Sequence, residues 1–325
     1  MGKLMNRILE KKENGNQFDN LKVDVEKIFQ QYHFKKNGTL VASKNRSKEY
    51  FFQKIYSSPL ISIRWKNYIW HMLRRTNLDQ SWFKIFSKYW SEILKGRPLW
   101  SPYDLFYLKN HYRIKFQNKY LPYSNSPSIH LKAWQEWELL YLLLHYATKE
   151  SFVNYSNCIN WYKKLRYKKS NTILEYGCSC APITTTFFEF LRSSQNDIFF
   201  LCDLQCLPFH YATYKFRNLP NVIPILLNPE NNFQLTLEKK VDVIFCLMVF
   251  EHLNEPLKTV KNFHQILNDG GVLFFDYIKG DGEGHDTFQA VKQRNEVLEF
   301  ICKHFTLLTG KIDKSESTKL TIVRK

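Results

Sequence analysis

Three small residues follow an apolar run near the start of the C-terminal half, at a point where a ligand could reach the backbone. The run Thr172–Tyr176 is followed by Gly177, Ser179 and Ala181. A glycine permits a tight turn, and the short side chains of Ser179 and Ala181 leave space for a ligand to lie against the main chain. In open α/β sheets, ligands bind at the carboxyl ends of strands where the winding direction reverses. We therefore expect a ligand site at this turn.

An acidic residue occupies the corresponding place after the next apolar run. Asp203 directly follows the run Ile198–Cys202. A carboxylate at such a strand end can accept hydrogen bonds from both hydroxyl groups of a ribose. The small-residue turn and Asp203 together predict a nucleoside ligand.

Two titratable residues, Glu251 and His252, begin a predicted helix after the fourth apolar run, near the place where a second substrate should lie. Histidine changes its charge near neutral pH, so His252 is a candidate general base. The alternative is a helix-start residue whose side chain bonds to the backbone. Further along, the polar segment Gly280–His285 is either a loop that closes over a substrate or an ordinary surface loop.

The cysteines are seven in number, and their spacing is irregular. This usage is typical of reduced, buried thiols in a cytoplasmic protein and not of a disulfide framework. Cys178, Cys180, Cys202 and Cys206 end the first two strands, where a metal site is conceivable, but small hydrophobic packing is the preferred interpretation. We expect no metal site.

Short apolar runs alternate with helical stretches after Lys169, as in a parallel sheet with crossover helices. The predicted strands are Thr172–Tyr176, Ile198–Cys202, Val222–Leu226, Val241–Cys246, Val272–Asp276, Thr306–Leu308 and Leu320–Val323. The predicted helices lie near Thr184–Arg192, Phe209–Arg217, Pro256–Leu267 and Thr287–Lys303. These elements predict an α/β fold with a doubly wound, seven-stranded, mostly parallel sheet that ends in an antiparallel hairpin.

The first half of the chain has a different composition. Residues 1–170 hold 31 Lys and Arg against 12 Asp and Glu, a net charge of +19, whereas residues 171–325 hold 16 against 18, a net charge of −2. All eight tryptophans lie between Trp65 and Trp161. The contrast predicts a basic, mainly helical region over residues 1–159, with a mobile stretch over residues 1–20, and a ligand-binding domain over residues 160–325.

Helical spacing supports this interpretation of the first half. Trp82, Phe86, Trp90 and Ile93 recur every three or four residues and predict an amphipathic helix, and the run 134–144 predicts a buried one. No apolar run approaches the ~20 residues that a membrane-spanning helix needs, and the first twelve residues are too charged for a signal peptide. We therefore expect a cytoplasmic protein without a transmembrane segment.

Five segments of the second half, in this order, resemble successive motifs of the class I S-adenosylmethionine-dependent methyltransferases. They are Ile173–Cys178, Asp203, Asp242–Phe245, Phe250–Leu253 and Leu267–Leu273. The resemblance covers about half of the chain and implies a Rossmann-like domain that uses S-adenosylmethionine. It implies that the cofactor is bound by Glu175, Gly177, Ser179, Asp203, Leu204, Asn228 and Met248.

The sequence departs from the family pattern in the small-residue turn. Ser179 and Ala181 stand where that pattern has further glycines, and only Gly177 is retained. Both replacements are small, so we expect the cofactor site to survive. The departure argues against a nicotinamide enzyme, because a pyrophosphate needs a glycine-rich turn that it can approach closely.

Three functions fit these patterns. The first is methyl transfer to a small polar acceptor, such as a carbohydrate or a phosphorylated metabolite, most simply at oxygen. The second is RNA methylation, in which the basic region and the cluster Lys163–Lys169 bind phosphate groups. This cluster would also suit a nucleotide-linked sugar or an anionic membrane surface, and the alternative is a solvated helical face in a lysine-rich protein. The third is a nucleoside-binding module without catalytic activity.

Overall fold

The computed structural model describes residues 80–94, 113, 133–134, 140–143, 156–165, 170–190, 196–228, 233–280 and 286–325. The predicted mobile stretch over residues 1–20 lies outside these ranges, as do residues 281–285 of the predicted polar loop and residues 166–169 of the basic cluster. The chain groups into two compact units, Met1–His111 and Tyr112–Lys325. No helix in the described part is long and apolar enough to cross a membrane.

The described part of the first unit contains one helix, α5 (Gln80–Glu92). Its apolar face holds Phe86 and Trp90, which are fully buried and whose rings stack with centroids 6.2 Å apart. Lys84 and Lys88 lie off this face and are exposed. The helix that the apolar spacing predicts is therefore confirmed.

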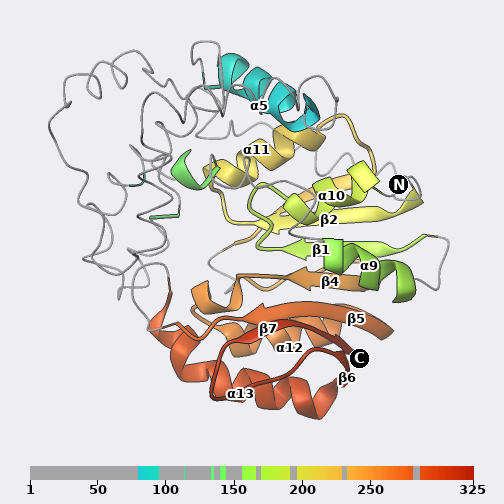
Figure 1. The fold of residues 1–325 in the computed structure, drawn as a ribbon, viewed down its shortest axis with the longest axis vertical. Coiled ribbons are helices and arrows are strands. Elements are labelled where there is room, and N and C mark those ends of the chain that lie inside the picture. The colour runs from blue at the N-terminus through green and yellow to red at the C-terminus, as the bar shows by residue number, and fades with distance from the viewer. Residues whose placement is uncertain are drawn as a thin grey trace, which may run out of the picture. The chain divides into compact units, whose positions relative to one another are not determined.

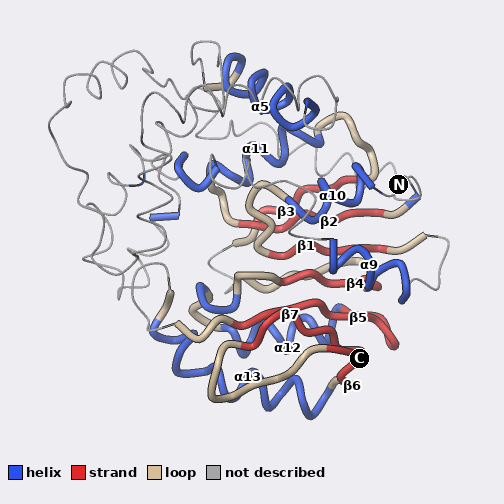
Figure 2. Tube along the Cα trace, viewed as in Figure 1, coloured by secondary structure: helices blue, strands red, loops and turns tan. Residues whose placement is uncertain are grey.

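The second unit contains a seven-stranded sheet with the order β3-β2-β1-β4-β5-β7-β6 (Figures 1 and 2). Strand β7 runs antiparallel to both of its neighbours, and the other strand pairs are parallel. The chain winds outward from β1 in one direction and then returns to the other side of it at β4. This confirms the predicted doubly wound sheet with a C-terminal hairpin. The strands are β1 (Thr172–Tyr176), β2 (Ile198–Asp203), β3 (Val222–Leu226), β4 (Val241–Cys246), β5 (Leu267–Tyr277), β6 (Thr306–Thr309) and β7 (Thr318–Arg324).

Helices pack on both faces of this sheet because its central strands are apolar on both sides. All six residues of β4 are buried, as is usual for a central parallel strand. On one face, Phe187 packs edge-on against Tyr162, Phe199 and Phe245. On the other face, every second residue of the central strands, such as Leu174 and Tyr176 in β1, packs in a core cluster with the helices over residues 256–266 and 288–304. The helices are α9 (Ser156–Leu165), α10 (Pro182–Phe190), α11 (Leu207–Phe216), α12 (Pro256–Ile266) and α13 (Phe288–His304).

Strand β5 begins five residues before the predicted strand. Gly270 N donates to Lys325 O and Lys325 N donates to Gly271 O, so the C-terminal residue extends the ladder of β5. Asn268 Nδ2 donates to Asp242 Oδ1, which ties the same segment to β4. The additional strand residues thus result from pairing with β4 at Leu267 and with Lys325 at Gly270 and Gly271.

A buried polar network fastens α9 to the start of the sheet. Tyr162 Oη donates to Asp197 Oδ2 over 2.9 Å, and Asn171 N donates to Asp197 Oδ1 over the same distance. Asp197 is fully buried, so its oxygens take their hydrogen-bond donors from the protein. The predicted domain boundary at residue 160 falls within α9, the helix that this network holds.

Replacement of Tyr162 by Phe should destabilise the second unit. Loss of a hydrogen bond to a buried carboxylate costs roughly 1.5–3 kcal/mol. Urea unfolding would measure the change, and a double-mutant cycle with Asp197→Asn would show whether the two side chains are coupled. An unfolding midpoint equal to that of the parent would contradict the role given to the network.

Candidate functional site

A cleft opens at the carboxyl ends of β1, β2 and β4, where the winding of the sheet reverses. Most of the residues that the sequence proposes for the site line this cleft: Glu175, Gly177, Ser179, Asp203, Leu204, Met248 and His252. Asn228 does not line it. Asn228 is exposed beyond β3, and its carbonyl accepts a hydrogen bond from Phe233 N.

The turn after β1 has the backbone conformation that glycine favours at all three of its small residues. The φ angles are +64° at Gly177, +50° at Ser179 and +53° at Ala181. A Cβ atom on Gly177 would lie 2.5 Å from a methyl carbon of Val249, so this position must be glycine. Ser179 and Ala181 adopt the same conformation at a cost of about 1–2 kcal/mol each. The turn therefore keeps its glycine geometry after two of the glycines have been replaced.

Glu175, the fourth residue of β1, caps the next helix from within the core. Its carboxylate accepts hydrogen bonds from Thr184 N and Ile183 N, and from the Thr184 hydroxyl over 2.6 Å. Burial raises the pKa of this carboxyl from 4.5 to about 7, and the three donors lower it in part. Glu175 thus holds the start of α10 against the turn, in addition to lining the cleft.

Asp203 ends β2, as predicted, and its carboxylate reaches across to the β1 turn. Oδ2 accepts a hydrogen bond from Ser179 N over 2.5 Å, and Oδ1 accepts one from Leu204 N over 2.7 Å. Burial raises the pKa of this carboxyl to about 6, and the two backbone donors lower it in part. A carboxylate has about four acceptor positions, so both oxygens can accept further hydrogen bonds from a ligand.

The segment after β4 forms the opposite wall of the cleft. Met248 has a φ angle of +56° and a side chain that is 51% exposed. Its backbone N donates to Asp276 Oδ1 over 2.6 Å, which fixes this unusual conformation to the end of β5. The exposed thioether is thereby presented at the cleft.

His252 lies in the short 3-10 helix η6 (Phe250–His252) at one end of the cleft. Its Nδ1 is 3.4 Å from Asp286 Oδ1, and its Nε2 is 3.9 Å from Glu251 Oε1. The ring of Trp134 lies with its centroid 5.6 Å from that of the His252 ring. An imidazole held between a carboxylate and an aromatic ring is suited to proton transfer.

Sequence reasoning missed several residues of the cleft, among them Trp134, Phe233, Val249 and Leu253. Val249 and Leu253 flank the predicted site positions, and Val249 is the side chain that a Cβ atom on Gly177 would meet. Trp134 lies far away in the sequence and gives no local signal of a role at the cleft. Phe233 accepts a hydrogen bond from Tyr176 Oη at its carbonyl, which sequence alone does not indicate.

The four cysteines near the turn, Cys178, Cys180, Cys202 and Cys206, are buried free thiols. Burial raises the pKa of the Cys178, Cys202 and Cys206 thiols well above the ordinary value. Among the residues that the structure describes, no group of three or more His, Cys, Asp or Glu side chains is arranged to hold a metal ion. Burial and the raised pKa together make the thiols of Cys178, Cys202 and Cys206 small neutral groups beside the turn.

Ser179→Gly should stabilise the protein, because glycine adopts a positive φ without steric cost. The gain of about 1–2 kcal/mol is reduced by about 0.5–1 kcal/mol of additional chain entropy in the unfolded state, which leaves roughly 0.5–1 kcal/mol. Ser179→Ala is the matched control, since it removes the hydroxyl and keeps the strain. Urea unfolding that gave the two variants equal stability would show that the turn is not strained at this residue.

Comparison with known proteins identifies the domain that carries this cleft. Residues 154–310 match the family model described as a methyltransferase domain. A solved structure described as a class I S-adenosylmethionine-dependent methyltransferase from Listeria monocytogenes is 16% identical and has a TM-score of 0.43, over 77% of this chain and 88% of that one.

Two curated relatives are tRNA U34 carboxymethyltransferases. The protein of Campylobacter concisus is 38% identical over 78 residues, which are 22% of this chain and 26% of that protein. The protein of Sulfurimonas denitrificans is 28% identical over 156 residues, which are 46% of this chain and 44% of that protein. The chain spans less than half the length of these relatives.

The family match extends from before β1 to the end of β6. It therefore contains all five segments that resemble the methyltransferase motifs. The cofactor of this family is S-adenosylmethionine, and the cleft lies where the doubly wound fold binds its ligand. Residues 154–310 therefore form an S-adenosylmethionine-dependent methyltransferase domain of class I.

Proposed function

We propose that the chain binds S-adenosylmethionine in this cleft and transfers its methyl group to a small polar acceptor, most simply at oxygen. The observation that carries the proposal is the hydrogen bond from Ser179 N to Asp203 Oδ2, which joins the β1 turn to the end of β2. It sets a fixed carboxylate beside a turn whose backbone is accessible. A nucleoside that also bears an amino-acid part fits this combination.

In this proposal different residues of the cleft bind different parts of the cofactor. Asp203 accepts hydrogen bonds from the two ribose hydroxyls at its remaining acceptor positions. Gly177 and Ser179 lie against the methionine part, and Leu204 and Met248 provide apolar contacts for the adenine. Asn228, outside the cleft, has no part in the proposed site. The bound cofactor supplies a methyl group on a positively charged sulfur, which makes that carbon electrophilic.

The chain contributes positioning and one proton acceptor. Methyl transfer is an in-line displacement, so much of the rate comes from holding the acceptor atom in line with the methyl group. His252, oriented by Asp286, takes the proton that a hydroxyl acceptor loses as its oxygen forms the new bond to carbon. The ring of Trp134 beside His252 offers an apolar surface for the body of the acceptor.

Calorimetry with S-adenosylhomocysteine tests the proposed cofactor site, and Asp203→Asn tests its central residue. Loss of the charge-assisted bonds should weaken binding by about ten- to a hundredfold, which corresponds to roughly 1.5–3 kcal/mol. Asp269→Asn is the matched control, because Asp269 is a surface residue whose side chain is 93% exposed. No detectable binding to the parent at millimolar ligand would favour a module without catalytic activity.

The same site predicts a pH dependence. Protonation of Asp203, whose pKa is raised to about 6, removes the acceptor charge that the ribose hydroxyls need. Affinity for S-adenosylhomocysteine should therefore be constant above this pKa and fall as the pH is lowered through it, by up to about tenfold per pH unit. The Asp203→Asn variant should lack this dependence. A parent affinity that stays constant from pH 8 to pH 5 would contradict the assignment.

RNA is the second candidate acceptor, and two observations favour it. Residues 1–170 carry a net charge of +19, and the curated relatives are named as tRNA-modifying enzymes. Lys163 and Lys164, in the last turn of α9, are exposed members of the predicted basic cluster. Lys164 Nζ lies 4.9 Å from the centroid of the Trp161 ring, so a cation and an aromatic surface are presented together.

RNA binding would show a steep dependence on salt, because phosphate contacts release counterions. Replacement of both Lys163 and Lys164 by Gln should reduce the slope of log affinity against log salt by roughly 1.5, at about 0.7–0.9 per contact. Replacement of the exposed Lys303 and Lys319 by Gln is the control of equal charge. Absence of RNA binding at low salt, or equal slopes for the two double variants, would remove the support for this acceptor.

A further inference from the structure

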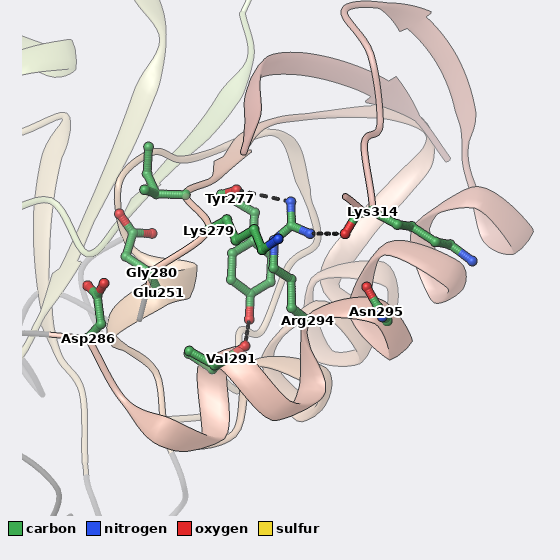
Figure 3. Close-up of a pocket in the computed structure, with 11 residues that line it drawn as sticks. Glu251, Tyr277, Lys279, Gly280, Asp286, Val291, Arg294, Asn295 and Lys314 are labelled. Atoms are coloured by element: carbon green, nitrogen blue, oxygen red, sulfur yellow. Dashed lines mark hydrogen bonds between the residues drawn. The ribbon is translucent and has the colours of Figure 1, made fainter. Parts of the chain in front are cut away.

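A second cavity, of about 200 Å³, lies beside the carboxyl end of β5 and does not share a lining residue with the cofactor cleft. Its walls come from η6, the end of β5, α13 and the loop before β7 (Figure 3). Glu251 lines this cavity, whereas the next residue, His252, lines the cleft. The two spaces are therefore neighbours across a single turn of backbone.

One side of the cavity is acidic, and one oxygen of its buried carboxyl group has no hydrogen-bonding partner among the described residues. Glu251 is only 4% exposed, and its Oε2 has no hydrogen-bonding partner among the described residues. Figure 3 shows Glu251 and Asp286 on the same side of the Tyr277 ring. Burial raises the pKa of the Glu251 carboxyl to about 8; a hydrogen bond from its own backbone N–H lowers it in part, and the negative charges of Asp276 and Asp286 raise it further. A buried carboxylate in this setting favours a ligand that brings both a donor and a positive charge.

The basic side chains of the cavity are already engaged by the protein. The two terminal nitrogens of Arg294 donate to the carbonyls of Asp313, Lys314 and Glu316, and its guanidinium carbon lies 5.4 Å from the centroid of the Tyr277 ring. Lys279 Nζ donates to Ser315 O over 2.7 Å. Lys314 Nζ pairs with a glutamate of α13, also over 2.7 Å. These cations hold the loop before β7, so they are poorly placed to neutralise Glu251. His252 Nε2 lies 3.9 Å from Glu251 Oε1, beyond hydrogen-bond distance, and leaves Oε2 without a partner among the described residues.

The rim of the cavity is apolar. Ile278 and Val291 line it and are 38% and 40% exposed, respectively. Phe288, one turn before Val291 on α13, is 64% exposed. An alkyl body can therefore lie against the rim while a polar head enters the cavity.

We propose that this cavity binds the ammonium group of an amine, with Glu251 as its acceptor, and that this amine belongs to the methyl acceptor molecule. The assignment to the acceptor rests on the proposed function, since it uses the position of the cavity next to His252. The ammonium group serves as an anchor, and the methylated atom lies on the part of the molecule that extends toward the cleft. The binding of an amine by Glu251 is independent of that assignment.

The proposal can be tested on the full chain with three probes of the same size: n-butylammonium, n-butanol and butyrate. Ligand-observed NMR titrations, with and without S-adenosylhomocysteine, should give butylammonium an affinity at least about tenfold higher than that of either other probe. Glu251→Gln keeps the shape and removes the charge, so it should abolish this preference. Glu255→Gln, at a partly exposed residue paired with Lys258, is the control and should behave like the parent.

The outcomes separate this proposal from the proposed function. Equal or tighter binding of butyrate would overturn the proposal, because it would mean that the basic side of the cavity recognises an anion. The Nε of Arg294, which has no acceptor among the described residues, is the donor that such an anion would use. Unchanged selectivity in Glu251→Gln would also overturn it. Glu251→Gln should bind S-adenosylhomocysteine like the parent, because Glu251 does not line the cleft. If the parent itself fails to bind S-adenosylhomocysteine, the proposed function fails, and the selectivity for butylammonium still decides the proposal.

Discussion

The hydrogen bond from Ser179 N to the carboxylate of Asp203 joins the two strands on which the whole cleft depends. The β1 turn has three residues with positive φ angles, and two of them are not glycine. Such a backbone persists only when its surroundings determine it more strongly than local preference does. Asp203 does this from one side and Glu175 from the other, through its bonds to the start of α10. The turn is thus held between the buried carboxylate of Glu175 and the partly buried carboxylate of Asp203.

This arrangement of carboxylates has an electrostatic cost that a ligand can relieve. Burial raises the pKa of both carboxyls, to about 7 for Glu175 and about 6 for Asp203. Glu175 accepts hydrogen bonds from Ile183 and Thr184 at the start of α10, so it has a structural role in addition to lining the cleft. Among the described residues, Asp203 accepts hydrogen bonds from two backbone donors, and it lines the cleft, so additional donors on a ligand would stabilise it more than Glu175. The two acids at the same turn are in this way suited to different tasks.

A similar division of tasks occurs at η6. His252 lies against Trp134 and Asp286 at the end of the cleft, whereas Glu251 lies in a separate cavity with an oxygen that has no hydrogen-bonding partner in the described part of the chain. Adjacent residues of a short 3-10 helix point in different directions, since each turn takes about three residues. A single short element can therefore present an imidazole to one space and a carboxyl group to the next.

The sequence by itself determined the order of the strands and helices of the second unit, because alternating apolar runs and short breaks are local signals. It also placed Gly177, Ser179 and Asp203 at strand ends that meet, since the topology of a doubly wound sheet brings these ends to one edge. It did not determine the extension of β5, which needs the backbone of Lys325 as a partner. Nor did it indicate that Trp134 would lie against His252 or that Glu251 would be buried in a cavity of its own. These features arise from packing between segments far apart in the chain, and only the tertiary structure decides which side chains then share a space and which lose their contact with water.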